Sequence, residues 1–153
     1  MAGKLAGSRM NRKSTKLQHR NLPLLLLQVR ERVLSHFRPI LKANGFTEQQ
    51  WRIVRALLEV DSLEPREIGE LCRISSPSLA GVLARMQELG LVARRRLPHD
   101  KRRLRVSLTP HARALAARMA PQIDATYRMI EELLGSEFSA RFERMLDQLL
   151  ATL

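Results

Sequence analysis

Apolar residues recur every three or four positions along most of the chain, which is the spacing of an α-helix. Between residues 26 and 41 this spacing predicts a first helix, which Asn21 can cap and whose first turn tolerates Pro23. Gly45 supplies a left-handed stop. Pro39 lies inside the pattern and is expected to kink the helix, because proline cannot donate the hydrogen bond of a helix interior.

Three shorter helices are predicted next. Thr47 and Gln50 form the T-x-x-Q pattern of a capping box, and the helix that follows is expected to end near residues 61 and 62. Pro65 opens the second of the three, and Ser76 is expected to cap the third, which Gly90 closes. The side chains expected to face the core are Trp51, Val54, Leu57 and Leu58 in the first, Ile68, Leu71 and Cys72 in the second, and Leu79, Val82, Leu83 and Met86 in the third.

After residue 90 the apolar period changes from about 3.6 to 2, which is typical of strands. Residues 91–97 and 104–108 are predicted to form two strands joined by the polar segment PHDKRR. Leu104, Val106 and Leu108 alternate with polar residues, so one face of this hairpin should pack against the domain.

Two long helices complete the predicted order α-α-α-α-β-β-α-α. Thr109 and Pro110 start the first, Pro121 should bend it, and Gly135 and Ser136 mark the start of the last helix. We therefore predict a mainly α fold with a small β-wing, in one domain over residues 21–153. Within it, a helix, a tight turn, a second helix and a two-stranded ribbon form a winged helix-turn-helix over about residues 47–109.

Composition agrees with one folded domain of 153 residues, since 44% of the residues are hydrophobic and 27% are charged. The longest apolar run, residues 22–27, is too short for a membrane span, and the N-terminus has no apolar signal-peptide region. We therefore expect a cytoplasmic protein. The single cysteine, Cys72, excludes an internal disulfide and a multi-cysteine metal site.

The net charge of +12 is unevenly distributed. Residues 1–20 contain six basic and no acidic residues, and we predict that they form a flexible basic arm. Residues 85–105 contain eight basic and two acidic residues, whereas residues 115–153 contain four basic and six acidic ones. A localised basic region is typical of proteins that bind polyanions, because neutralising phosphates releases counterions.

The second helix of the helix-turn-helix is expected to enter the major groove of DNA, where the pattern of base edges is unique. Its first turn is small and polar, so the backbone can approach DNA closely, and Arg85 lies about one turn further on. The cationic tip of the hairpin is expected to follow the DNA backbone, with an arginine in the minor groove and Asp100 fixing a nearby guanidinium. The DNA-binding candidates are Ser75, Ser76, Pro77, Ser78, Gly81, Arg85, Arg95, Asp100, Lys101, Arg102 and Arg103.

The segments SSPSLAGVLARMQELGLVARR and DKRRLRVSLT resemble the recognition helix and wing of the multiple-antibiotic-resistance regulator (MarR) family. The resemblance extends over residues 21–153, and residues 21–57 further resemble the branch that regulates homoprotocatechuate and related aromatic-acid catabolism. It implies that Arg102 is the wing arginine for the minor groove and that Asp100 supports it. Position 103 departs from the family pattern, because Arg103 stands where many members have a small residue.

The resemblance also implies a homodimer built from the helices at both ends of the chain, about residues 21–44 and 110–153. Their broad apolar stripes independently favour such a dimer, since they exceed what one small winged domain can cover. The function implied is a repressor of an aromatic-acid catabolic operon, bound to a pseudo-palindromic operator of double-stranded DNA and released by a small aromatic carboxylate. Candidate residues for that effector are Arg30, His36, Arg38 and Trp51, because guanidinium groups bind carboxylates and an aromatic wall can contact the ring.

Three alternatives remain open from the sequence. Cys72 could make the protein a redox-sensing regulator of the same family, although it shares the apolar face of Ile68 and is expected to be buried. A nucleic-acid chaperone that uses only the basic arm would show no sequence preference. An enzyme is not expected, and neither is a cofactor or metal, because the four histidines are far apart and none has the spacing of a nucleophile or metal site.

Overall fold

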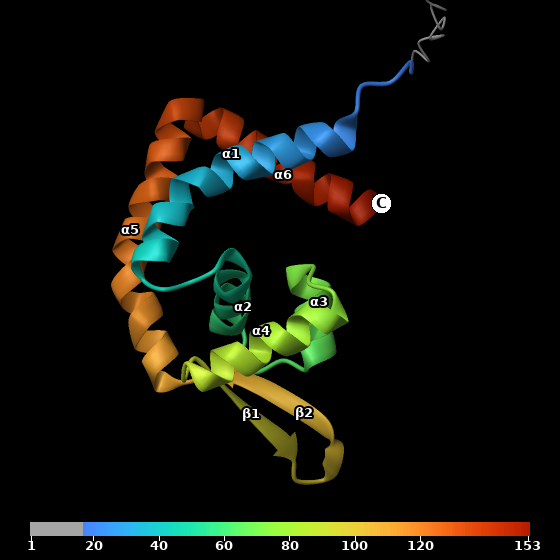
Figure 1. The fold of residues 1–153 in the computed structure, drawn as a ribbon. Helices are drawn as coiled ribbons and strands as arrows, with labels where there is room; N and C mark the ends of the chain where they lie inside the picture. Colours follow the sequence, from blue (N-terminus) through green and yellow to red (C-terminus); the bar gives the residue numbers. More distant parts are fainter. Residues whose placement is uncertain (1–16) are drawn as a thin grey trace, which may run out of the picture.

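The computed structural model describes residues 17–153, and its elements follow the predicted order (Figure 1). They are α1 Leu22–Ala43, α2 Glu48–Glu59, α3 Pro65–Cys72, α4 Ser76–Glu88, β1 Val92–Leu97, β2 Asp100–Leu108, α5 Pro110–Leu134 and α6 Ser136–Thr152. The predicted fold class, mainly helical with a two-stranded wing, is confirmed. Most of the basic arm predicted for residues 1–20 lies outside the described residues, which include only 17–20 of it.

The long helices and the winged helix-turn-helix occupy different parts of the molecule (Figure 1). α1 and α6 lie at one end, while α2, α3 and α4 form a compact group near the base of the β1–β2 wing. α5 runs from the wing to α6 and joins the two parts. The wing therefore lies at the end of the molecule opposite α1 and α6.

Three of the predicted helix starts, those of α1, α2 and α5, are confirmed by hydrogen bonds at the caps. Asn21 Oδ1 accepts from the amide of Leu24 at 3.0 Å, Thr47 and Gln50 form both bonds of a capping box, and Thr109 Oγ1 accepts from Ala112 at 3.1 Å. The start predicted for α4 was wrong by one residue.

The N-cap of α4 is Ser75, not Ser76, and Ser76 is already helical. Proline lacks an amide proton but fits anywhere in the first turn, where amides have no helical partner, so the helix can begin one residue before Pro77. Unlike α1, α2 and α5, α4 has no side chain that accepts a hydrogen bond from its first amides.

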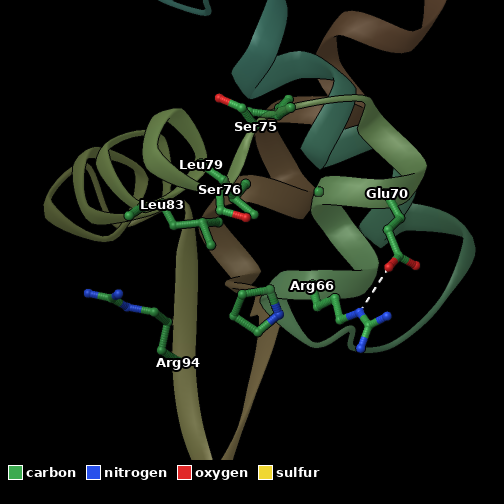
Figure 2. A pocket seen from close by; sticks show the side chains of 11 residues that line it. Arg66, Glu70, Ser75, Ser76, Leu79, Leu83 and Arg94 are labelled. Atoms are coloured by element: carbon green, nitrogen blue, oxygen red, sulfur yellow. Dashed lines mark hydrogen bonds and ion pairs between the residues drawn. The ribbon is translucent and has the colours of Figure 1, made fainter.

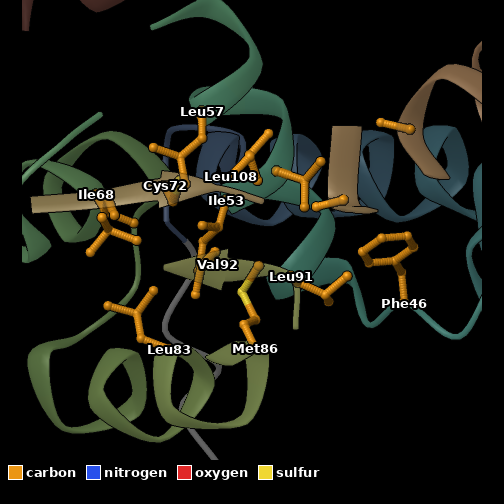
Figure 3. Packing of buried hydrophobic residues seen from close by; sticks show 14 of the residues in the cluster. Phe46, Ile53, Leu57, Ile68, Cys72, Leu83, Met86, Leu91, Val92 and Leu108 are labelled. Carbon is orange, nitrogen blue, oxygen red and sulfur yellow. The ribbon is translucent and has the colours of Figure 1, made fainter. Parts of the chain in front are cut away.

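The core packs α2, α3 and α4 against the two strands and the first half of α5 (Figure 3). Ile53, Leu57 and Met86 are fully buried in it. The prediction that Leu58 and Leu71 face the core was wrong, because their exposed fractions are 40% and 63%. Both lie one helical step of about 100° from a buried residue, so a short helix with one contact face cannot bury them as well.

The second strand of the wing begins earlier than the sequence pattern predicted. β2 starts at Asp100 rather than Leu104, and it pairs with β1 from Val92 opposite Leu108 to Leu97 opposite Asp100. The tip is exposed on both faces, so no apolar alternation marked those first four residues of β2. Towards its base, β2 is also bonded on its other side to the α2–α3 connection, where the amide of Leu63 donates to Val106 O at 3.0 Å.

The two proline-containing helices continue through their prolines. α1 includes Pro39 and α5 includes Pro121 without a break in either helix, and α5 is bowed in Figure 1. The predicted stop is confirmed at Gly135, which has φ +88° and separates α5 from α6. Among the helices described for residues 17–153, none has the length and apolar character needed to cross a membrane.

Candidate functional site

The first turn of α4 is exposed and presents uncapped amides. Ser75, Ser76, Pro77 and Ser78 all face solvent. The hydroxyls of Ser75 and Ser78 bond to each other at 3.1 Å, and neither accepts from an amide of the first turn. The positive end of the helix dipole and its free N–H groups therefore remain available, which is the arrangement that binds phosphate at helix N-termini.

This turn borders an open hollow of about 600 Å³ between α3 and α4 (Figure 2). Ser75, Ser76, Leu79 and Leu83 line it from α4 and its cap, and Arg94 lines it from β1. On the α3 side, Arg66 Nε donates to Glu70 at 2.9 Å. The helix start and the first strand of the wing thus belong to one continuous surface.

The turn between α3 and α4 is fixed by close backbone contacts. A Cβ on Gly69 would lie 3.2 Å from the carbonyl oxygen of Ile74, so α3 and the turn approach as only glycine permits. Arg73 adopts a left-handed conformation with φ 52° at the end of α3. Arg52 of α2 donates to the carbonyl oxygen of Cys72 at 2.6 Å, which satisfies an unpaired helix carbonyl. The contact of Arg52 was not predictable from the sequence, since nothing in a helical pattern shows which carbonyl 20 residues away a side chain will reach.

The second half of α4 contacts the wing. Gly81 is exposed, and a Cβ there would meet nothing within 4 Å. Arg85 is exposed and forms an ion pair with Glu88 at 3.0 Å. Arg94 of β1 donates to Gln87 of α4 at 2.5 Å, so the wing and α4 are hydrogen-bonded to each other.

The cations of the wing fall into two groups. Within the described residues, the side chains of Arg95, Lys101 and Arg102 have neither a hydrogen bond nor an ion pair, and all three are exposed. The others are held by protein groups. Arg96 donates to the carbonyl of Lys101 at 2.6 Å, and Arg103 Nε donates to Glu64 at 2.6 Å.

The predicted role of Asp100 needs correction. Its Oδ1 accepts a hydrogen bond from the backbone amide of Arg102 at 3.0 Å, and it forms no ion pair with a guanidinium among residues 17–153. The wing has only two residues, Pro98 and His99, between its strands, so the carboxylate meets the nearby backbone first. Asp100 therefore shapes the backbone beneath Arg102 instead of holding its side chain.

Two of the four predicted effector residues come together at the α1–α2 junction, but both are already paired. Arg30 lies 2.7 Å from Glu31 and 3.5 Å from Glu48, while Arg38 contacts Glu31 and lies 2.5 Å from Glu48. The hydrogen bond from Arg38 lowers the pKa of Glu31. In turn, the hydrogen bond to Glu31, and after it the one to Glu48, raises the pKa of Arg38. Neither acid was among the predicted site residues, although Glu31 precedes Arg38 by seven residues and so shares a helix face with it.

The other two predicted effector residues lie apart from this cluster. Trp51 is half-buried and packs edge-on against Phe46 with 5.5 Å between ring centroids. His36 is exposed on α1. A second hollow of about 560 Å³ lies between the end of α1 and the start of α2, and of the four candidates only Arg38 lines it.

Cys72 is buried, as the sequence predicted. Burial raises the pKa of its thiol, and the charge of Arg52 offsets this only in part. A raised pKa disfavours the reactive thiolate, so the structure offers no support for the redox alternative.

Comparison with known proteins agrees with this architecture. The MarR family matches residues 44–103, which run from the C-cap of α1 to the tip of the wing. The homoprotocatechuate degradative operon repressor of Escherichia coli is 41% identical over 133 residues, covering 87% of this chain and 90% of that protein. The chain belongs to the MarR family.

Solved structures of MarR-like fold resemble most of the chain. NadR in complex with 4-hydroxyphenylacetate is 36% identical, with a TM-score of 0.78 over 88% of this chain and 96% of that one. The repressor CouR bound to a 23-mer DNA duplex is 25% identical, with a TM-score of 0.77 over 84% of this chain and 92% of that one. This MarR-family protein is accordingly related to transcriptional regulators, which are not enzymes.

Proposed function

We propose that this protein is a dimeric repressor of an aromatic-acid catabolic operon, which binds a pseudo-palindromic operator and leaves it when a small aromatic carboxylate binds. The observation that carries the DNA-binding part is the pairing of two features. The uncapped, serine-lined start of α4 adjoins a wing on which Arg95, Lys101 and Arg102 have no protein partner among residues 17–153. Both features offer hydrogen-bond donors to phosphates and bases.

On DNA, α4 lies in the major groove with its first turn against the backbone and the base edges. The amides of Ser76 and Ser78 donate to phosphate, while the serine hydroxyls reach polar edges. Arg85 exchanges its exposed partner Glu88 for a phosphate or a guanine edge, which costs little because an exposed ion pair is weak. The wing places Arg102 in the minor groove, where a narrow A·T-rich groove attracts arginine.

The dimer is supported by the apolar surface that one chain leaves exposed. α6 has no buried residue at all, although it is amphipathic. Leu150 of α6, Leu133 near the end of α5 and Leu153 after α6 are each more than 70% exposed. The apolar stripe of α1 from Leu22 to Val33 is also largely exposed. A two-fold dimer that buries these faces presents two α4 helices to successive major grooves about 34 Å apart.

The effector site is proposed at the α1–α2 junction, from two supports. The related Escherichia coli protein represses a homoprotocatechuate degradative operon, and the NadR structure contains 4-hydroxyphenylacetate, so aromatic carboxylates occur in this group. In this chain Arg30 and Arg38 form a pair of guanidinium groups beside an open hollow that includes Phe46. An incoming carboxylate replaces Glu31 or Glu48 on an arginine and thereby alters the contact between α1 and α2.

Selection of bound duplexes from a random library, followed by competition with random DNA, tests the DNA-binding part. We expect an enriched inverted repeat and at least about a thousandfold preference for it over random duplex. A preference below about tenfold, or an enriched site without symmetry, would contradict a dimeric sequence-specific repressor.

Thermal stabilisation by 4-hydroxyphenylacetate and by homoprotocatechuate tests the effector part. We expect the active compound to raise the melting temperature and to release the selected operator. Arg38→Gln should abolish both effects, whereas Arg118→Gln, an exposed arginine on α5, should preserve them. Equal stabilisation of both variants would place the effector elsewhere.

A further inference from the structure

Two arginines on one face of β2 are held by the connection between α2 and α3. Arg103 Nε donates to Glu64 Oε1 at 2.6 Å, and the same carboxylate contacts a second nitrogen of that guanidinium. Arg105 donates to the backbone carbonyl of Ser62 at 2.9 Å and to its hydroxyl at 3.1 Å, and lies 3.6 Å from Glu67. These contacts join residues about 40 positions apart in the sequence.

The backbone explains why these side chains meet. Leu63 and Val106 form an antiparallel bridge with hydrogen bonds in both directions, at 3.0 and 2.8 Å. Side chains alternate between faces, so Ser62 and Glu64, which flank Leu63, lie on the same face as Arg103 and Arg105. Leu63 and Val106 point instead to the other, core-facing side.

Glu64 also belongs to the start of α3. It occupies the N-cap position, and its amide donates to Glu67 Oε2 at 2.6 Å within a capping box. The carboxylate that pairs with the wing is therefore part of a rigid helix start rather than a free loop. Its hydrogen bond raises the pKa of Arg103, and its side chain is only 26% exposed.

We propose that the Glu64–Arg103 pair is a latch that sets the position of the wing relative to the helix-turn-helix, and that Arg103 is a positioning residue rather than a DNA contact. Arg103 is bonded to Glu64, whereas the side chain of its neighbour Arg102 is exposed and has no partner among residues 17–153. The latch therefore holds β2 through Arg103 and leaves Arg102 available to DNA. This inference rests on the proposed DNA binding, and it revises the direct DNA contact expected for Arg103 from the sequence.

Removing the carboxylate of Glu64 distinguishes a positioning role of the pair from simple charge repulsion between Glu64 and DNA. An acidic residue near DNA repels phosphates, so Glu64→Gln should tighten binding if the pair has no positioning role. With the latch, Glu64→Gln and Arg103→Gln both weaken operator binding, by about two- to fivefold for each wing, the range expected of an exposed pair. Glu59→Gln, which removes an exposed acid of α2 that forms no ion pair among residues 17–153, serves as the matched control and should not weaken binding.

The salt dependence separates positioning from direct phosphate binding. If Arg103 bound a phosphate, Arg103→Gln would reduce the slope of log affinity against log salt by about 0.9 for each phosphate that is no longer neutralised. The latch predicts an unchanged slope. The charge-reversed double variant Glu64→Arg with Arg103→Glu should recover affinity to within about twofold, because the pair re-forms with opposite polarity.

Amide hydrogen exchange of the free protein provides a readout that does not depend on DNA. We expect residues 94–105 to exchange about two- to fivefold faster in both single variants, and at the wild-type rate in the double variant. If no variant or wild type binds DNA specifically, the proposed function fails while this exchange still tests the latch. Wild-type exchange in Glu64→Gln, or tighter operator binding by it, would overturn the latch.

Discussion

At the residue scale, the wing shows that one residue type has different roles according to its neighbours. Arg102 and Arg103 are adjacent and have the same side chain, yet only Arg103 has an acidic partner among residues 17–153. The difference follows from the bridge between Leu63 and Val106, which brings Glu64 within reach of Arg103. Counting basic residues in the wing therefore overstates the number available to DNA.

Arg102→Ala should weaken operator binding by about 1–3 kcal/mol, or about 5- to 150-fold, because the wing then has no side chain to place in the minor groove. Fluorescence anisotropy with the selected operator measures the effect, and circular dichroism verifies the fold. Arg118→Ala on α5 is the control. An affinity equal to that of the wild type, in a correctly folded variant, would reject the role of Arg102.

Cys72 should react slowly with alkylating reagents at a pH of about 8. The residue is only 5% exposed and burial raises the pKa of its thiol, so little thiolate is present below the ordinary pKa of 9.0. We expect labelling at least about tenfold slower than in urea, and Cys72→Ala should bind DNA normally. Fast labelling accompanied by loss of DNA binding would favour the redox alternative instead.

At the element scale, the capping side chains determine where helices begin and which helix starts keep amides without an acceptor. Asn21, Thr47 and Thr109 satisfy the amides at the starts of their helices. α4 is the exception, since Ser75 bonds to Ser78 instead of to the backbone. An open helix start at the surface is what a phosphate site requires, so this departure from regular capping is consistent with DNA binding.

Thr109 connects the wing to α5, and its removal should destabilise that junction. Its hydroxyl accepts from the amide of Ala112 and donates to the carbonyl of Gly90 at 2.5 Å. Thr109→Ala should lower the free energy of unfolding by about 1–2 kcal/mol, whereas Thr109→Ser, which keeps the hydroxyl, should lose less than half of that. Urea denaturation measures both values, and equal losses would show that the methyl group matters more than the two hydrogen bonds.

At the scale of the whole molecule, charge and apolar surface are segregated. The wing contains three exposed cations that have no partner among residues 17–153, namely Arg95, Lys101 and Arg102, while most of the exposed large apolar side chains lie on α1, the second half of α5, and α6. Figure 1 places the wing and the α1 and α6 helices at opposite ends of the molecule. A dimer formed at one end thus leaves the other end open to DNA.

Leu150→Glu should convert the proposed dimer into monomers. Leu150 is 75% exposed on α6, and burying a carboxylate in an apolar interface is costly. Sedimentation equilibrium at micromolar concentration measures the change. Gln148→Glu adds the same charge at an exposed polar position of the same helix and should remain dimeric. If Leu150→Glu stays a dimer with wild-type affinity, α6 does not form the interface.

The sequence by itself determined the elements, most of their ends and the location of the positive charge. These properties depend on local physics, since apolar periodicity selects helix or strand and a cap bonds to an amide three residues away. Thr47, Thr109 and Gly135 were predictable for this reason. The early start of β2 was not, because its exposed tip is defined by pairing with β1 rather than by its own pattern.

The tertiary structure decided which charged groups are paired. Arg103 and Glu64 are 39 positions apart, and no local pattern shows that a bridge between Leu63 and Val106 brings them together. The same holds for Arg38 and Glu48, which meet only where α1 turns into α2. An ion pair depends on distances of a few ångströms between side chains, and only the folded backbone sets those distances.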